Sequence, residues 1–237
     1  KNERLDKPGE KISVETPLHT KGQVMPYVSR GGLKLEKALN VFAINVQGKT
    51  MLDIGSSTGG FTDVALQNGA RLSYALDVGY NQLAWKIRQD ERVVVMERTN
   101  FRYSKPEDFT EGVPDIATID VSFISLRLIL PPLHDILKKG GSVVALIKPQ
   151  FEAGKEFVGK KGIVRDPETH QMVVEEITRF AMNNGYDVKN LDFSPITGGE
   201  GNIEFLAHLV SVDGEGSYQA TESIEEVVAH AHQKLVE

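Results

Sequence analysis

Short apolar, β-branched runs alternate with helical patterns from residue 50 onward, and this alternation is typical of a parallel α/β sheet. The apolar runs predict seven strands, at residues 50–54, 71–78, 92–97, 115–121, 142–148, 186–193 and 203–210. Helical spacing predicts one helix that begins after Ser29 and further helices near residues 60–68, 81–89, 125–138 and 167–183. Three glycines stand where helix C-terminal caps are expected: Gly69, Gly140 and Gly185.

The end of the chain adds two details to this pattern. Only the loop "SPITGGEGN" separates the last two strands, which is too short for a helical crossover, so they should form an antiparallel hairpin. The predicted fold class is therefore α/β, with a mostly parallel seven-stranded sheet and a reversed last strand. The tail "TESIEEVVAHAHQKLVE" places its apolar residues on one face, which predicts a helix packed on the core. Pro131 is expected in the first turn of a new helical segment.

Composition sets the domain organisation and narrows the class of protein. A chain of 237 residues with 40% hydrophobic residues can bury a full core. Residues 1–25 are polar and contain prolines, so we expect a separate N-terminal piece followed by one domain over 26–237. The absence of cysteine excludes disulfides and thiolate metal sites and agrees with a reducing cytoplasm, where we expect the protein. No apolar run approaches the roughly 20 residues of a membrane span, and no membrane partner is expected.

Charge restricts where a polyanion could bind. The net charge of -6 argues against a general nucleic-acid binder, so any polyanion would need a local basic patch. Two stretches could supply one: residues 1–21, with five lysines and arginines, and "KEFVGKKGIVR" at residues 155–165. Either stretch could equally be solvated surface. We predict no metal site, because His230 and His232 point to different faces of the tail helix and no cysteine accompanies them.

The loop "DIGSSTGGF" lies between a predicted strand and a predicted helix, where open α/β sheets bind ligands. The spacing of Gly55 and Gly60 approaches that of a phosphate-binding loop, but Phe61 stands in the slot of the phosphate-neutralising lysine. A dinucleotide loop would want glycine where Ser57 stands. The loop therefore fits an adenosine-type ligand without a phosphate group. The alternative is that Asp53 merely caps the helix and the glycines merely make a turn.

Polar residues at other strand ends extend this interpretation. Asp77 ends the second strand, 24 residues after Asp53, where a carboxylate can accept hydrogen bonds from ribose hydroxyls. Asn100 follows the third strand and Asp120 ends the fourth, at the same edge of the sheet. S-adenosylmethionine fits such a site, because its sulfonium is a cation that Asp53 would attract. The predicted cofactor-binding residues are Asp53, Gly55, Ser57, Gly59, Gly60, Phe61, Asp77, Asn100 and Asp120.

Several motifs in order make the interpretation more specific. "YVSRGGLKLEKAL", "LDIGSSTGGFTD", "DVSFISL", "LIKPQFE", "GIVRD" and "EGNIEFLAHL" resemble the FtsJ-like methyltransferases, in particular the TlyA or haemolysin A subfamily of rRNA 2'-O-methyltransferases. The resemblance runs from about residue 27 to residue 209. It implies a Rossmann-like methyltransferase sheet, S-adenosylmethionine as cofactor, and ribosomal RNA or ribosomal subunits as partners. Residues 1–20 resemble only the last stretch of the family's N-terminal RNA-binding module.

The resemblance also places a catalytic set on this chain. The family's Lys-Asp-Lys-Glu residues fall on Lys34, Asp120, Lys148 and Glu204. From the residues alone, these ionisable groups beside apolar runs could equally form a structural ion-pair network. Our hypothesis is that Lys34 lies near Lys148, and that a like charge or desolvation lowers the pKa of a lysine. Lys148 would then act as base or orienting group on a ribose 2'-hydroxyl, with the other three in support.

Other functions remain open at this stage. Enzymes that methylate exocyclic amines often carry Asp/Asn-Pro-Pro-Tyr/Phe after the fourth strand, whereas this chain has "DVSF" there, and the lack of cysteine excludes cysteine-nucleophile methylation. A membrane-active haemolysin is an alternative, although no strongly apolar segment supports it. A cofactor-binding RNA-interaction protein without catalysis is another. Phe151 and Phe157 could stack on an extruded base or simply pack.

Overall fold

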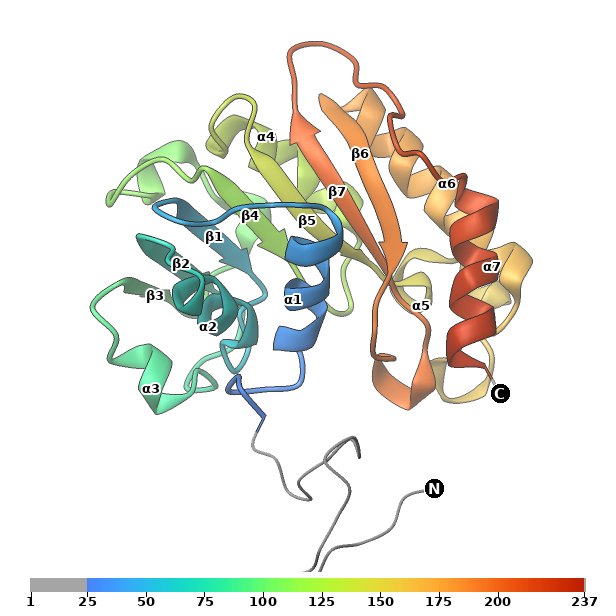
Figure 1. Cartoon of the computed structure of the whole chain (residues 1–237), viewed down its shortest axis with the longest axis horizontal. Helices are drawn as coiled ribbons and strands as arrows, with labels where there is room; N and C mark the ends of the chain where they lie inside the picture. Colours follow the sequence, from blue (N-terminus) through green and yellow to red (C-terminus); the bar gives the residue numbers. More distant parts are fainter. Residues whose placement is uncertain (1–24, 237) are drawn as a thin grey trace, which may run out of the picture.

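A computed structural model describes residues 25–236 of the chain, so the prediction for residues 1–25 falls almost entirely outside it. The structure contains one seven-stranded sheet with the order β3-β2-β1-β4-β5-β7-β6 (Figure 1). All neighbouring strands pair in parallel except β7, which is antiparallel to both β5 and β6. The strands are β1 Thr50–Ile54, β2 Leu72–Leu76, β3 Val93–Met96, β4 Ile116–Ile119, β5 Ser142–Ile147, β6 Tyr186–Phe193 and β7 Phe205–Ser211. The predicted fold class and its reversed last strand are confirmed.

Helices cover both faces of the sheet. The first layer contains α1 Gly32–Val41, α2 Gly60–Gln67 and the short α3 Trp85–Arg88. The second contains α4 Leu130–Ile136, α6 Pro167–Asn183 and α7 Ile224–Leu235, whose apolar residues join the largest buried cluster with the other face of the sheet. The tail helix thus packs on the core as predicted. Among residues 25–236, no helix has both the length and the apolar character that crossing a membrane requires.

Two predicted helices differ in extent from the observed ones. The helix expected at 81–89 is only four residues long, because Asn81 has a left-handed backbone (φ +58°) and Ala84 is extended, so helical geometry begins at Trp85. The helix expected at 125–138 is divided into a 3₁₀ turn at Leu126–Leu128 and α4, with Pro131 in the first turn of α4 as predicted. A further short helix, α5 Pro149–Glu152, was not predicted. The three cap glycines all have positive φ, between 77° and 88°.

The topology brings three of the predicted catalytic residues to one edge of the sheet. The parallel strands β4, β5 and β6 all end at the lower edge in Figure 1. Asp120 and Lys148 directly follow β4 and β5 there. Because β7 runs the opposite way, its first residues lie at this same edge, and Glu204 directly precedes it. A purely parallel sheet would have placed Glu204 at the far end of its strand.

Candidate active site

The glycine loop after β1 runs against the backbone that follows β4. Gly55 has φ of +84°, and a Cβ placed on it would lie 2.2 Å from the carbonyl oxygen of Asp120. Gly59, with φ of +101°, precedes α2, and a Cβ on Gly60 would lie 2.5 Å from Ser29 Oγ. Gly55 and Gly60 are therefore needed for close approach. Through Gly55, the predicted cofactor loop touches the predicted catalytic aspartate.

Asp53 lies beneath this loop rather than at its surface. Its side chain is 0% exposed, and Thr62 donates to Oδ2 from both its backbone N–H (3.2 Å) and its hydroxyl (2.8 Å). Thr118 Oγ donates to Oδ1 over 3.3 Å. Burial raises the pKa of Asp53 to about 7, and the charge of Asp120 adds to this while the Thr62 hydrogen bonds oppose it. The expectation that this carboxylate faces a cationic ligand does not agree with its burial, because Thr62 and Thr118 enclose the side chain.

The Phe61 ring also occupies a different place from the one expected. It is 4% exposed and belongs to an apolar cluster with Leu35 and Ala38 of α1. The first turn of α2 turns its side chains toward α1, so the ring packs in the core. The buried ring is therefore not placed to contact a cofactor. Only the backbone of Phe61, at the start of α2, remains a predicted cofactor contact.

A hollow lies beside the loop, at the ends of β2 and β3. Asp77 is its central carboxylate: Oδ2 accepts from the backbone N–H of Ser57 (2.7 Å) and Oδ1 from that of Gly79 (2.9 Å). The hollow is shallow, about 10 Å³ in volume, so a nucleoside would rest on it rather than enter it. The residues around it are Ser56, Ser57, Ala75, Asp77, Gly79, Tyr80, Gln82, Leu83, Val95 and Glu97.

The remaining predicted cofactor residues divide between this hollow and its surroundings. Ser57 is exposed, has φ of +49° and lines the hollow. Asn100 does not line it; instead its side-chain oxygen accepts from Arg102 N–H (3.1 Å) and caps the 3₁₀ turn Phe101–Tyr103. Asp120 lies on the other side of the glycine loop, among the predicted catalytic residues. The hollow thus brings together Ser57 and Asp77 but not Asn100.

The four predicted catalytic residues form a row of linked ion pairs with alternating charge, which we call the charged chain. Lys34 Nζ, on α1, lies 3.1 Å from Glu204 Oε1 and 3.5 Å from Asp120 Oδ2. Lys148 Nζ lies 2.5 Å from Asp120 Oδ1. Lys34 and Lys148 are each 8% exposed and Glu204 is 1% exposed. The order Glu204, Lys34, Asp120, Lys148 balances two positive and two negative charges in a nearly buried site.

This arrangement sets the protonation of its central members. Burial alone would lower the pKa of Lys34, but the Asp120 and Glu204 carboxylates outweigh it, so the pKa of Lys34 is raised above its ordinary value. Burial pushes the pKa of Asp120 upward, yet Lys148 and Lys34 together hold that pKa below its ordinary value. The hypothesis that a like charge or desolvation lowers the pKa of the reacting lysine stays a prediction. Asp120 stands between the two ammonium groups and compensates their repulsion.

Two further polar residues complete the site, and neither was singled out from the sequence. Gln150 Nε2 donates to Glu204 Oε2 over 2.8 Å, while its own Oε1 is buried and has no hydrogen-bond partner in the described part of the chain. Ser122 Oγ accepts from Lys148 Nζ over 3.4 Å. Gln150 stands two residues after Lys148 in "LIKPQFE", and only the short turn of α5 brings it back toward Glu204.

Aromatic side chains lie beside Lys148 at the protein surface. Phe123 follows β4, is 90% exposed and has a left-handed backbone (φ +63°). Its ring is 4.7 Å from that of Phe151, centroid to centroid, and Lys148 Nζ lies 6.0 Å from the Phe151 centroid. Phe151 therefore packs against Phe123. The exposed face of this pair offers a stacking surface next to the charged chain.

Comparisons with known proteins agree with this geometry. The family model described as FtsJ-like methyltransferase matches residues 27–210. YqxC of Bacillus subtilis, provisionally named an rRNA methyltransferase, is 64% identical over 236 residues, 99% of this chain and 84% of the relative. TlyA of Mycobacterium tuberculosis, named a 16S/23S rRNA (cytidine-2'-O)-methyltransferase, is 46% identical over 183 residues, 77% of this chain and 68% of the relative.

A solved structure from Streptococcus thermophilus, provisionally named a hemolysin, is 62% identical to this chain. It matches with a TM-score of 0.87 and covers 97% of this chain and 82% of its own. Both the family match and these relatives extend over most of the described residues, including the glycine loop and all four members of the charged chain. The protein belongs to the FtsJ-like methyltransferase family.

Proposed function

We propose that the protein transfers a methyl group from S-adenosylmethionine to a ribose 2'-hydroxyl of ribosomal RNA. The observation that carries this proposal is the alternating charged chain, in which Lys34, Lys148 and Glu204 are buried and Asp120 is half-buried. It touches the glycine loop through Gly55. The RNA class of substrate is supported by the names of YqxC and TlyA. The 2'-hydroxyl as acceptor is supported by the name of TlyA and by the presence of paired lysines instead of a base-methylation motif.

The hollow beside the loop suits S-adenosylmethionine in its chemistry. Its lining includes the carboxylates Asp77 and Glu97 and no lysine or arginine, which disfavours a phosphate group. Each carboxylate oxygen of Asp77 accepts one backbone N–H and keeps a further acceptor position, which ribose hydroxyls can use. When bound, S-adenosylmethionine supplies an electrophilic methyl group on a sulfonium. The glycine loop would lie beside its amino-acid end.

The charged chain gives its two lysines different tasks. Lys34 contacts two carboxylates and is held protonated, so its task is to fix Asp120 and Glu204. Among residues 25–236, Asp120 is the one carboxylate that Lys148 contacts, and Lys148 forms the end of the charged chain. We assign Lys148 to orient the ribose hydroxyl and to accept its proton as the new oxygen–carbon bond forms, which requires the Lys148 amine to react uncharged. Asp120 holds that amine in line, and alignment supplies much of the rate.

Lys148→Ala and Lys148→Arg together test this assignment. We expect Lys148→Ala to lower methyl transfer to isolated ribosomal subunits by about 1,000-fold or more, within the range of a general base combined with orientation. Lys148→Arg keeps a cation that cannot accept a proton, so it should be equally inactive. Both variants should bind S-adenosylmethionine like the wild type in calorimetric titration. Substantial transfer by Lys148→Arg would show that Lys148 only orients the hydroxyl.

The position of the methyl group tests the reaction itself. A 2'-O-methylated ribose blocks alkaline cleavage of the next phosphodiester bond, so the modified RNA should yield one alkali-resistant dinucleotide that carries the labelled methyl. Label on a base would refute the 2'-hydroxyl as acceptor. A protein that binds the cofactor but transfers no methyl group would support the non-catalytic RNA-interaction alternative. Failure to bind S-adenosylmethionine would refute the proposal as a whole.

A further inference from the structure

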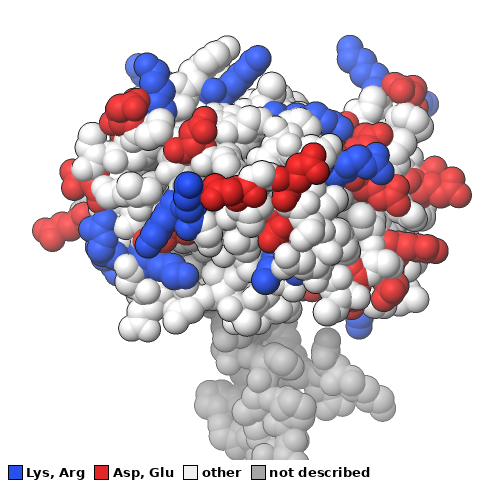
Figure 2. Space-filling model, turned by 90° about the horizontal axis from the view of Figure 1, so that it is seen from above, with Lys and Arg blue, Asp and Glu red and all other residues white. Residues whose placement is uncertain are grey.

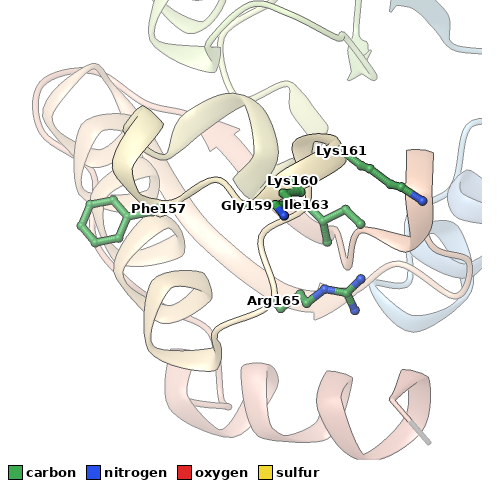
Figure 3. A pocket seen from close by; sticks show the side chains of 6 residues that line it. All are labelled: Phe157, Gly159, Lys160, Lys161, Ile163 and Arg165. Carbon is green, nitrogen blue, oxygen red and sulfur yellow. The ribbon is translucent and has the colours of Figure 1, made fainter.

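The basic stretch at residues 155–165 has no task in the reaction described above. It follows α5 and encloses a hollow of about 450 Å³ that is separate from the one beside Asp77 (Figure 3). Three of the six lining residues are cations, and none is acidic. They are Phe157, Gly159, Lys160, Lys161, Ile163 and Arg165. In Figure 3 the Lys161 and Arg165 side chains extend in the same direction, with Ile163 between them, while Phe157 points the other way.

These cations are not neutralised by neighbouring carboxylates. Lys160, Lys161 and Arg165 are all exposed, and no described carboxylate lies within 4.0 Å of their side-chain nitrogens. The opposite edge of the sheet differs: seen from above, positive and negative side chains are interspersed there (Figure 2). At the amino end of β5, Lys139 lies 3.3 Å from Asp213. In a chain of net charge -6, the hollow concentrates positive charge that has no carboxylate partner among residues 25–236.

Buried hydrogen bonds hold this stretch in one shape. Lys161 has φ of +65°, a conformation that costs a side-chain-bearing residue free energy unless its surroundings enforce it. Asn202, which is 3% exposed, holds the backbone in this conformation. Its Nδ2 donates to the Gly162 carbonyl (2.9 Å) and its Oδ1 accepts from Val164 N–H (3.0 Å). The Val164 carbonyl in turn lies 2.8 Å from His170 Nε2. The cations are therefore presented by a preorganised segment.

The same contacts place the hollow near the reacting groups. Asn202 stands two residues before Glu204, and two residues of chain span at most about 7 Å. With the length of the Asn202 side chain and its hydrogen bonds, the segment around Ile163 lies within roughly 15 Å of the Glu204 backbone. The stretch also follows Lys148 and α5 directly in sequence, at the lower edge in Figure 1. An RNA strand bound at Lys148 would reach this hollow within a few nucleotides.

We propose that Lys160, Lys161 and Arg165 bind the phosphodiester backbone of the RNA strand that flanks the methylated nucleotide. The inference rests on the proposed function and adds to it a second contact region for the same substrate. Cations on a fixed backbone neutralise phosphates and release their counterions, which gives affinity and register without reading sequence. Gripping the flanking strand lowers the entropy that the target ribose must lose when it aligns with Lys148.

The double variant Lys161→Gln and Arg165→Gln tests this surface. Its matched control is Lys138→Gln with Lys139→Gln, which removes the same charge at the opposite edge. Binding of a short fluorescein-labelled single-stranded RNA is measured across a salt series. If each lost cation removes one phosphate contact, affinity should fall about tenfold at low salt, and the slope of log K against log salt should shrink by roughly 1.4. The control should match the wild type.

Methyl transfer to ribosomal subunits provides the second readout. We expect the double variant to raise KM for subunits severalfold, with kcat at saturation and the affinity for S-adenosylmethionine unchanged. Unchanged RNA affinity and salt slope would overturn the inference, as would a wild-type protein that binds no RNA at low salt. Failure of the proposed function is distinguishable, since it would appear as absent methyl transfer by a wild type that still shows the salt-dependent RNA binding.

Discussion

Two neighbouring regions at one edge of the sheet, the charged chain and the glycine loop with its hollow, are built in opposite ways. Around β4, β5 and β7, four ionisable side chains that are buried or nearly so complete one another's charges over distances of 2.5 to 3.5 Å. Around β1, β2 and β3, the glycine loop, of which Ser57 is the exposed residue, borders a hollow of only about 10 Å³. The predicted catalytic half is held together by contacts between its own side chains. The half that would hold the methyl donor is shaped by backbone.

The free-energy cost of burying charge explains why the two regions differ. Buried charges are tolerated only with partners, so Lys34, Asp120, Lys148 and Glu204 must be positioned together or not at all. The glycine loop carries little charge of its own. Asp77 accepts from its Ser57 N–H, and Asp53 lies beneath it with hydrogen bonds to Thr62 and Thr118. On the proposed function, preorganisation in the catalytic half would serve alignment, and the open hollow would allow exchange of the methyl donor after each turnover.

Removing Asp120 should give the largest effect, because it would break the charge alternation at its centre. Asp120→Ala leaves the Lys34 and Lys148 ammonium groups facing each other without a carboxylate between them. We expect methyl transfer to fall by about 1,000-fold or more and the free energy of unfolding to fall by roughly 3 kcal/mol. Urea unfolding and labelled methyl transfer measure the two effects.

The control for this experiment is Asp213→Ala, whose carboxylate pairs with Lys139 while both side chains are about 80% exposed or more. Such a surface pair contributes little, so its loss should leave both quantities close to wild type. If Asp120→Ala were as stable as Asp213→Ala, the charged chain would not be the interdependent unit described above.

Asp53→Asn should change how stability depends on pH, which tests the support beneath the loop. The pKa of Asp53 is about 7 in the folded protein against 3.8 for the unperturbed group. Between these values the folded state holds a proton that the unfolded state has lost, so the free energy of unfolding falls as pH rises. The wild type should lose roughly 3 kcal/mol between about pH 5 and about pH 8 through this group.

Asp53→Asn has no titrating group at this position and should lack that loss, while it keeps acceptors and a donor for Thr62 and Thr118. Asp120, whose pKa is lowered, titrates below this interval and leaves the comparison intact. Urea unfolding of both proteins at the two pH values measures the difference. Parallel pH profiles would show that Asp53 is ionised in the folded protein throughout.

Asp77→Ala should weaken binding of S-adenosylmethionine with little effect on the charged half. Loss of hydrogen bonds to a carboxylate predicts about a 30-fold rise in Kd, which calorimetric titration can measure. Asn100→Ala is the matched variant, because Asn100 was predicted from the sequence but does not line the hollow. Equal losses in the two variants would extend the cofactor site beyond the hollow, and no loss in Asp77→Ala would place it elsewhere.

Gln150→Leu should have the smallest effect of this series. It removes the 2.8 Å hydrogen bond to Glu204 Oε2 but leaves the Lys34 contact to Oε1. We expect kcat to fall about fivefold, near 1 kcal/mol, while KM for ribosomal subunits stays unchanged. Gln150→Glu, which would place a second carboxylate against Glu204, should be more harmful. If Gln150→Glu were as active as the wild type, Gln150 would not position Glu204.

The sequence by itself determined the framework of this protein. Strand positions, the reversed β7 and the first turn of α4 depend on spacing, loop length and proline geometry, which are local properties of the chain. The resemblance to a family located Lys34, Asp120, Lys148 and Glu204, and the structure places them together. These features could be predicted because each is written within a short segment or in a recognisable motif.

Only the tertiary structure decided the environment of the individual groups. The enclosure of Asp53, the packing of Phe61 against α1 and the contact of Gln150 with Glu204 each depend on segments distant in sequence. The raised pKa of Lys34 depends on the carboxylates of Asp120 and Glu204, which only the fold brings beside this amine. Burial and electrostatics are sums over all neighbours in space, and a linear pattern does not name those neighbours.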